Sequence, residues 1–220
     1  MKFIPPAILA IGRNYADHAA EMGGVVDPNP IVFLKNPACV IGDGDTIEIP
    51  PICREHGPQV DYEGELAIEI GRDCRDVPES DALSVVRAYR AANDVSARWW
   101  QKQGSGGQFC RGKSFDTFCP LSEPMSAHSV GDPSCLRLQT KLNGQVVQDA
   151  STSQMFHSVP RIIAALSRGT TLLKGTIILT GSPSGVGAAR VPPLFLKDGD
   201  EVVVEIAGVG RTRNPVRELP

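Results

Sequence analysis

The sequence lacks the features that several classes of protein require. None of its six cysteines belongs to a Cys-X-X-Cys pair, and no closely spaced histidine or cysteine completes a zinc site, which excludes zinc-finger classes. No apolar run approaches the roughly 20 residues of a membrane span. Lysine and arginine number 22 against 25 acidic residues, and the net charge of −3 provides no positive field for a phosphate backbone. We therefore expect neither a membrane nor a nucleic-acid partner.

Internal repeats and low-complexity linkers are absent as well, which predicts a single domain over residues 1–220. The apolar stretch 3–12 is short, carries Pro5-Pro6 and leads into a polar motif, so we expect no signal peptide. An even number of cysteines could form disulfides in a secreted protein, but without a secretory signal we expect reduced, buried thiols in a cytoplasmic protein. Aromatic residues make up only 5% of the chain, but 41% hydrophobic and 21% charged residues are typical of a folded globular protein.

The 22 glycines and 18 prolines predict many turns between short elements, and hence a strand-rich α+β fold. Periodicity predicts helices over 14–22 and 158–168, the first with Asn14 as its N-cap, and one or two helical turns over 81–86. Alternating apolar residues predict a hairpin turning at Asn143-Gly144 and strands over 31–34, 46–49, 61–70, 176–180 and 201–206. The elements show no regular βαβ alternation, which argues against Rossmann and TIM-barrel folds.

Acidic side chains alternate along the strand predicted over 61–70. The alternation places Glu63, Glu65 and Glu69 on one face, where neighbouring carboxylates repel one another unless a cation lies between them. Oxygen ligands select Mg²⁺, Mn²⁺ or Ca²⁺ over zinc. Asp94 offers a further carboxylate in a stretch of small residues. Taken alone, the paired acids could equally line a solvated strand edge, and Asp94 could cap a turn.

Other candidates for chemistry are a histidine, a lysine and a glycine-rich loop. His18 and Glu21 lie one helical turn apart, where a carboxylate can fix the imidazole tautomer and raise its basicity; a surface i, i+3 contact is the alternative. Lys113 is either a cation for an oxyanion or a solvated side chain. The loop 181–187 has the glycine content of an anion cradle but lacks the Gly-Lys-Ser/Thr ending of a P-loop, so nucleotide binding is not expected.

These pieces occur together, in an order that resembles the fumarylacetoacetate hydrolase family. The resemblance covers residues 11–213 and is carried by Ile11-Gly12-Arg13-Asn14-Tyr15-X-X-His18-X-X-Glu21, Asp61-Tyr62-Glu63-X-Glu65-Leu66, Asn93-Asp94-Val95-Ser96-Ala97-Arg98, Gly112-Lys113-Ser114-Phe115-Asp116, Leu142-Asn143-Gly144 and Thr180-Gly181-Ser182-Pro183-X-Gly185-Val186-Gly187. It is closest in kind to the compact, single-domain, acylpyruvase-like members. The implied fold is a mixed β-roll that forms a homodimer, with a lid segment at about 12–24 and a core at about 31–213.

The resemblance also implies roles for individual residues. It implies that one Mg²⁺ or Mn²⁺ per chain is bound by Glu63, Glu65 and Asp94. On the lid, His18 and Glu21 would activate water, while Lys113 would face the substrate oxyanion. The implied substrate-binding residues are Arg13, Gln101 and Thr180. One departure is Trp99, which stands where relatives usually carry an acidic residue and is expected to alter the pocket wall.

The activity expected from these residues is hydrolysis of the carbon–carbon bond of an acylpyruvate, such as fumarylpyruvate or acetylpyruvate, to pyruvate and a carboxylic acid. The same constellation also supports loss of CO₂ from oxaloacetate, or isomerisation of related oxo-diacids, because neither needs an attacking water. A catalytically idle protein that binds a small acid is the alternative from another functional class.

Overall fold

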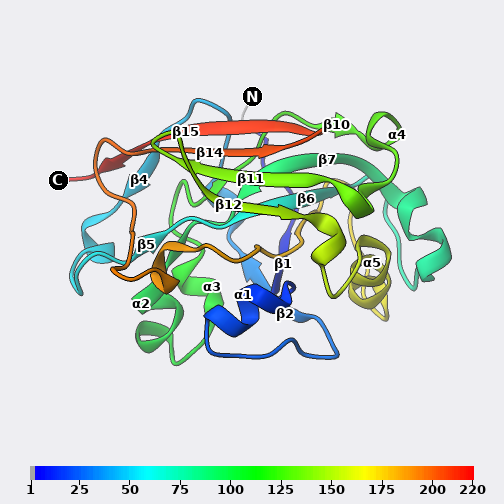
Figure 1. The fold of residues 1–220 in the computed structure, drawn as a ribbon. Helices are drawn as coiled ribbons and strands as arrows, with labels where there is room; N and C mark the ends of the chain where they lie inside the picture. The colour runs from blue at the N-terminus through cyan, green and yellow to red at the C-terminus, as the bar shows by residue number, and fades with distance from the viewer. Residues whose placement is uncertain (1–2) are drawn as a thin grey trace.

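The computed structural model describes residues 3–220 and contains two main β-sheets and two short strand pairs (Figure 1). The larger sheet has, in spatial order, β10 (Met125–Ser126), β7 (Val86–Asn93), β6 (Gly64–Ile70), β13 (Ile177–Leu179), β1 (Ile8–Gly12) and β2 (Ile31–Lys35). The smaller has β12 (Gln145–Ser151), β11 (Arg137–Leu142), β14 (Glu201–Ile206), β15 (Gly210–Glu218) and β4 (Ile47–Ile49). The pairs are β3 (Val40–Ile41) with β9 (Cys119–Pro120), and β5 (Val60–Asp61) with β8 (Ser96–Ala97).

The helices are short and lie mostly around the larger sheet. They are α1 (Ala16–Glu21), α2 (Arg98–Gln101), α3 (Phe109–Gly112), α4 (Ala127–Val130) and α5 (Val159–Ser167). Short 3₁₀ helices occupy Pro37–Cys39, Pro51–Cys53, Glu79–Val85, Gln103–Ser105, Pro133–Cys135, Thr152–Gln154 and Gly187–Ala189. Figure 1 shows α1, α2 and α3 together on the side of the molecule away from β14 and β15. None of the helices within residues 3–220 has the length and apolar composition that a bilayer crossing needs.

The core lies between the two sheets, because β14 and β15 pack against β7 and β11 packs against β6. Strand β6 is buried along its whole length and separates two sets of side chains. Leu66 and Ile68 belong to the main apolar cluster, whereas Ala67 belongs to a smaller one with residues of β1, β2 and β13. Glu65 and Ala67 share a face of the strand because side chains alternate. The strand therefore carries Glu65 on its face away from the main core.

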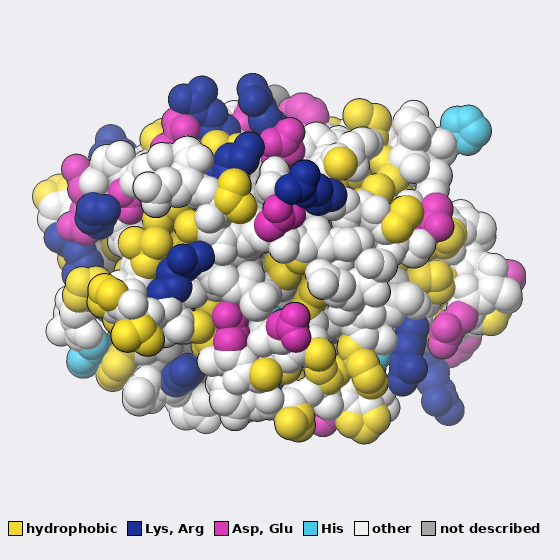
Figure 2. All heavy atoms as spheres, viewed as in Figure 1, with side chains coloured by type: hydrophobic (Ala, Val, Ile, Leu, Met, Phe, Trp, Pro, Cys, Tyr) yellow, Lys and Arg dark blue, Asp and Glu magenta, His cyan; other side chains and the backbone are white. Residues whose placement is uncertain are grey.

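Most sequence-based expectations for individual elements are confirmed. Asn143 and Gly144 both have positive φ, 51° and 79°, as a type I′ hairpin turn requires. Ser158 accepts a hydrogen bond from the backbone of Arg161 at the start of α5. The chain is strand-rich α+β, and neither main sheet closes into a barrel within the described residues. On the face in Figure 2, acidic and basic side chains are interspersed over the smaller sheet, in line with the small net charge.

Two expectations are wrong, and one strand was not expected. Asn14 does not cap α1: the N-cap is Tyr15, and the Asn14 amide instead donates to the carbonyl oxygens of His157 and Thr180, tying the segment before α1 to two distant loops. The thiols are free but not all buried, since Cys110 and Cys135 are exposed. The longest strand, β15, was not expected, because its sequence Gly-Arg-Thr-Arg-Asn-Pro-Val-Arg-Glu is mostly polar; it lies at the molecular surface, with only alternate residues buried.

A buried ion pair on β6 gives a test of the fold. Glu69 accepts hydrogen bonds from Arg87 and from Arg90, whose Nη2 lies 2.9 Å away. We expect Glu69→Gln to lower the free energy of unfolding by roughly 3–5 kcal/mol, because Arg90 remains buried without its counter-charge. The matched control is Glu205→Gln, which removes an exposed ion pair with Lys141 and should cost less than about 1 kcal/mol. Urea denaturation measures both, and equal losses would contradict this account.

Candidate active site

Three carboxylates meet where strand β6 begins and strand β7 ends. Glu63 precedes β6, Glu65 is its second residue, and Asp94 follows β7. The antiparallel register pairs Gly64 with Asn93, and the Asp94 amide donates to the Glu63 carbonyl at 2.8 Å, so the acids are neighbours in space. One oxygen from each lies within 4.8 Å of the others, and the exposed fractions are only 5%, 2% and 0%. This burial rules out the solvated strand edge.

Basic side chains balance two of the three acids. Lys113, which ends α3, donates to Glu63 at 2.6 Å, to Asp94 and to the Ser96 hydroxyl at 2.8 Å. Arg98 lies 2.8 Å from Glu63. Burial by itself would raise the pKa of Glu63, but the Lys113 and Arg98 charges lower it well below its ordinary value.

Glu65 has no such counter-charge. Its carboxylate accepts a hydrogen bond from the Gly181 amide, at 2.7 Å, and within residues 3–220 it forms no ion pair. Burial, and then the charges of Asp94 and Glu63, raise the pKa of Glu65 well above its ordinary value. Three buried oxygen donors with one uncompensated charge among them suit a hard divalent cation. The residues therefore fit the metal that the sequence implies.

The glycine-rich loop 181–187 binds carboxylates of the protein itself. Besides the Gly181 amide on Glu65, the Gly185 amide donates to both oxygens of Glu21, at 3.1 and 3.0 Å, and the Gly187 amide donates to Asp61 at 2.7 Å. A side chain on Gly185 would meet the carbonyl oxygen of Val147 at 2.2 Å, so glycine is required there. The loop thus holds anions of the protein itself and ties α1 to β6.

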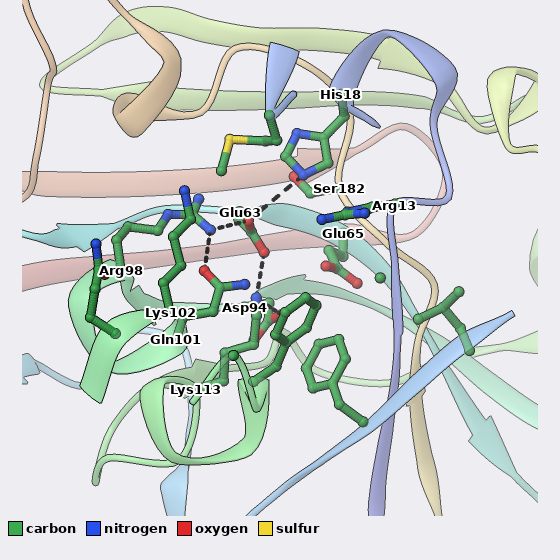
Figure 3. A pocket seen from close by; sticks show the side chains of 17 residues that line it. Arg13, His18, Glu63, Glu65, Asp94, Arg98, Gln101, Lys102, Lys113 and Ser182 are labelled. Atoms are coloured by element: carbon green, nitrogen blue, oxygen red, sulfur yellow. Dashed lines mark hydrogen bonds and ion pairs between the residues drawn. The ribbon is translucent and has the colours of Figure 1, made fainter. Parts of the chain in front are cut away.

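His18 and Glu21 form the expected pair on α1. Nδ1 of His18 lies 2.9 Å from the Glu21 carboxylate, and Nε2 lies 3.9 Å from Glu63. Burial opposes ionisation of Glu21, but the bonds from His18 and Gly185 outweigh it and lower the pKa of Glu21. An ionised carboxylate only accepts, so it fixes the hydrogen on Nδ1 and leaves the lone pair of Nε2 facing the carboxylates (Figure 3). The pair is therefore more than a surface contact.

A cavity of about 540 Å³ opens beside these groups, a size typical of small-molecule sites. It is walled by the three acids, by His18 and Met22 of the α1 segment and by aromatic side chains, and its full lining is Ile11, Gly12, Arg13, His18, Met22, Phe33, Glu63, Glu65, Asp94, Arg98, Gln101, Lys102, Gln103, Gly107, Phe109, Lys113 and Ser182. Figure 3 shows Arg13 and Lys102 on opposite sides of the carboxylates.

The structure gathers most of the site residues expected from the sequence. Arg13 and Gln101 line the cavity, as expected. Thr180 does not: its hydroxyl donates to the Leu66 carbonyl at 2.8 Å, so its substrate role stays a prediction. Lys113 lies against Glu63 and Asp94 rather than free in the cavity, and its role toward an oxyanion also stays a prediction.

Sequence reasoning missed Lys35. Its ammonium is fully buried and donates to Asp94 and to the carbonyl oxygens of Phe118 and Val95. The signal was present, because strand alternation places Lys35 on the same buried face as Phe33. A lysine on a buried face requires an acidic partner. Burial would lower the pKa of Lys35, but the Asp94 charge raises it above its ordinary value.

Arg98 lines the cavity, whereas Trp99, which was expected to alter its wall, does not. Arg98 bonds Asp61 through Nε and Nη2 and the Gln101 side-chain oxygen through Nη1, so it links β5 to the start of α2. Trp99 does not line the cavity; its ring stacks on His56 with centroids 3.6 Å apart. A side chain on Gly104 would lie 2.3 Å from the Trp99 ring, so the loop after α2 packs directly on this indole.

Comparison with known proteins agrees with this geometry. Residues 7–217 match the family model described as fumarylacetoacetate (FAA) hydrolase C-terminal. The chain belongs to the fumarylacetoacetate hydrolase family. The family resemblance seen in the motifs is thereby confirmed, and the chain has the strand-rich α+β fold that it implied. The homodimer and the lid segment stay predictions.

The names of individual relatives state different activities. The chain is 43% identical over 213 residues to the mitochondrial oxaloacetate tautomerase fahd2 of Xenopus laevis, covering 96% of this chain and 66% of that protein. A 5-carboxymethyl-2-hydroxymuconate delta-isomerase from Mycobacterium smegmatis matches with a TM-score of 0.85 at 41% identity, over 99% of this chain and 80% of that one. A fumarylacetoacetate hydrolase from Exiguobacterium antarcticum matches with a TM-score of 0.87 at 39% identity, over 99% and 77%. The chain thus spans just under two thirds of the length of the Xenopus relative.

The uncompensated charge of Glu65 predicts how the protein responds to metal. Mn²⁺ at a hundredfold excess over its Kd should stabilise the wild-type protein by about 2.7 kcal/mol. Glu65→Gln should abolish this stabilisation without lowering the melting temperature of the metal-free protein, because it removes a repelled, buried carboxylate. Glu205→Gln, on the distant strand β14, serves as the control and should respond like wild type. Thermal unfolding with and without Mn²⁺ measures the effect; undiminished stabilisation of Glu65→Gln would show that the cation binds elsewhere.

Proposed function

We propose that this chain is a metal-dependent enzyme that interconverts the enol and keto forms of a 2-oxo acid, with oxaloacetate as the reference substrate. The observation that carries the proposal is the free Nε2 of His18, which is held over three buried carboxylates at the wall of a small cavity. The names of the Xenopus tautomerase and the Mycobacterium isomerase support the same reaction class. The proposal includes one catalytic domain over residues 1–220; homodimerisation remains a prediction.

The chain's own residues supply the proton transfer. In the keto-to-enol direction, the bond between carbon 3 and its hydrogen breaks, His18 Nε2 takes the proton, and the electron pair forms the double bond to carbon 2 while the ketone oxygen takes a proton from water. His18 then returns its proton to water. Glu21 holds the ring and stabilises the imidazolium that forms. Glu63, Glu65 and Asp94 would hold a divalent cation, which would supply Lewis acidity and so make the hydrogen on carbon 3 more acidic.

The hydrogen bonds of Lys113 support this reaction over the hydrolysis expected from the sequence. An ammonium has three donors, and those of Lys113 are directed to Glu63, Asp94 and Ser96. Hydrolysis needs a donor for the oxyanion that water attack creates, whereas tautomerisation creates no tetrahedral oxyanion. The arrangement therefore favours proton transfer over water attack.

One observation favours acylpyruvate hydrolysis as a second candidate function. The His18–Glu21 pair has the geometry of a general base for water as well as for a carbon acid. The likeness to the Exiguobacterium fumarylacetoacetate hydrolase supports this candidate. It requires Lys113 to leave Glu63 or Asp94, or another donor to replace it.

Three assays on the Mg²⁺- or Mn²⁺-loaded protein separate the candidates. We expect rapid loss of the ultraviolet absorbance of enol-oxaloacetate, abolished by a chelator and restored by added metal. Pyruvate release from acetylpyruvate or fumarylpyruvate reports hydrolysis, and CO₂ release from oxaloacetate reports decarboxylation. If kcat/KM for pyruvate release or for CO₂ release exceeds kcat/KM for the loss of enol-oxaloacetate, then hydrolysis or decarboxylation replaces tautomerisation as the function. Inactivity in all three assays would favour a catalytically idle protein that binds a small acid.

Removal of the imidazole tests the proton carrier. We expect His18→Ala to lower kcat for tautomerisation by roughly 10²–10⁴-fold, the usual contribution of a positioned general base, with a smaller change in KM. Stopped-flow absorbance of enol-oxaloacetate measures the rate. The control is His128→Ala, which changes an exposed histidine of α4 and should leave kcat within twofold of wild type. A His18→Ala enzyme with near wild-type kcat would eliminate His18 as the base.

A further inference from the structure

The basic side chains of the cavity fall into two kinds. Arg98 and Lys113 are buried and bonded to the acids. Arg13 and Lys102 also line the cavity, but within residues 3–220 neither forms an ion pair with an acidic side chain. Two cations at a cavity wall without acidic partners leave their charge available to an anion from outside.

Lys102 lies at the mouth of the cavity. On this side, the wall of the cavity consists of the buried Gln101 and of three exposed residues, Lys102, Gln103 and Gly107. The loop is closed by the Gly107 amide, which donates to the Lys102 carbonyl at 2.7 Å. Its Gly104 lies on the Trp99 ring, where a side chain would not fit. The backbone that carries Lys102 is therefore fixed while its ammonium remains accessible.

Arg13 lies on the opposite side of the carboxylates from Lys102 (Figure 3). Its guanidinium packs against the backbone of Gly24, because a side chain on Gly24 would lie 2.8 Å from Nη1. The two cations are therefore placed to receive the two ends of an anion that carries two carboxylates.

Charge balance also favours an anion with two carboxylates. Around the site, four buried acids, Asp61, Glu63, Glu65 and Asp94, face three buried bases, Lys35, Arg98 and Lys113. A divalent cation would reverse this deficit to a single positive charge. Arg13 and Lys102 add two positive charges and the ionised Glu21 removes one, which leaves a net charge of two. A monoanion would leave half of this charge unmatched, whereas a dianion neutralises it.

We propose that Lys102 is a specificity-determining residue, whose ammonium receives the second carboxylate of a 2-oxo dicarboxylic acid while the 2-oxo carboxylate lies at the Glu63–Glu65–Asp94 end. The inference rests on the proposed function for the identity of the inner end. It adds that the enzyme selects dicarboxylates over monocarboxylates at the mouth of the cavity and that one exposed lysine makes this selection.

Binding of malate and lactate to the Mg²⁺-loaded protein tests the proposal without turnover. These 2-hydroxy acids differ in that malate carries the second carboxylate. Isothermal titration calorimetry should show that wild type binds malate at least about tenfold more tightly than lactate, the value of one hydrogen bond to a charged group. Lys102→Gln should lose this preference, and Lys102→Arg should retain most of it. The control Lys174→Gln, an exposed lysine outside the cavity lining, should bind both acids as wild type does.

The kinetic arm separates failure of this inference from failure of the proposed function. For oxaloacetate, Lys102→Gln should raise KM about tenfold with kcat changed less than threefold, because Lys102 binds the second carboxylate whereas His18 takes the proton from carbon 3. A wild-type enzyme that tautomerises oxaloacetate but binds malate and lactate equally would overturn the inference alone, as would a Lys102→Gln variant that keeps the malate preference. Absence of tautomerisation together with a Lys102-dependent malate preference would overturn the function and leave the dicarboxylate site standing.

Discussion

Mutual repulsion among buried carboxylates is the constraint on which the rest of this structure depends. Glu63, Glu65 and Asp94 are nearly devoid of solvent contact, and unpaired charges in such a place are costly. Two of the acids are balanced by neighbouring ammonium and guanidinium groups, so that the remaining imbalance is concentrated at Glu65. A protein that only needed a stable core would gain by replacing these acids with apolar residues. The arrangement is understandable if a doubly charged ion completes it.

The fold delivers this arrangement through backbone pairing and one loop. The antiparallel register of β6 and β7 brings two acids near in sequence beside a third that is about 30 residues away. The loop 181–187 then holds Glu65, Glu21 and Asp61 through its amides. Because Glu21 orients His18, the same loop couples the proton carrier on α1 to the carboxylates. Positioning is thus achieved with main-chain groups, which cannot rotate away as side chains can.

Strand alternation, helical spacing and turn chemistry predicted the candidate pairs Glu63–Glu65 and His18–Glu21 and the hairpin, whereas the family resemblance implied the metal set with Asp94 and the role of His18. The sequence did not predict β15, whose polar residues conceal a surface strand, or the role of Asn14, whose partners His157 and Thr180 are more than 140 residues away. Lys113 could be placed near the site but not bonded to particular acids. Such contacts depend on which loops meet in space, and no periodicity in a single sequence encodes that.

Direct observation of the cation tests the account most sharply. Crystals of the protein grown or soaked with Mn²⁺ should show an anomalous difference peak coordinated by one oxygen from each of Glu63, Glu65 and Asp94. Lys113 should still donate to the oxygens of Glu63 and Asp94 that do not contact the cation. The account is contradicted if Mn²⁺ binds elsewhere, or not at all, while the three carboxylates keep their present positions around the lysine.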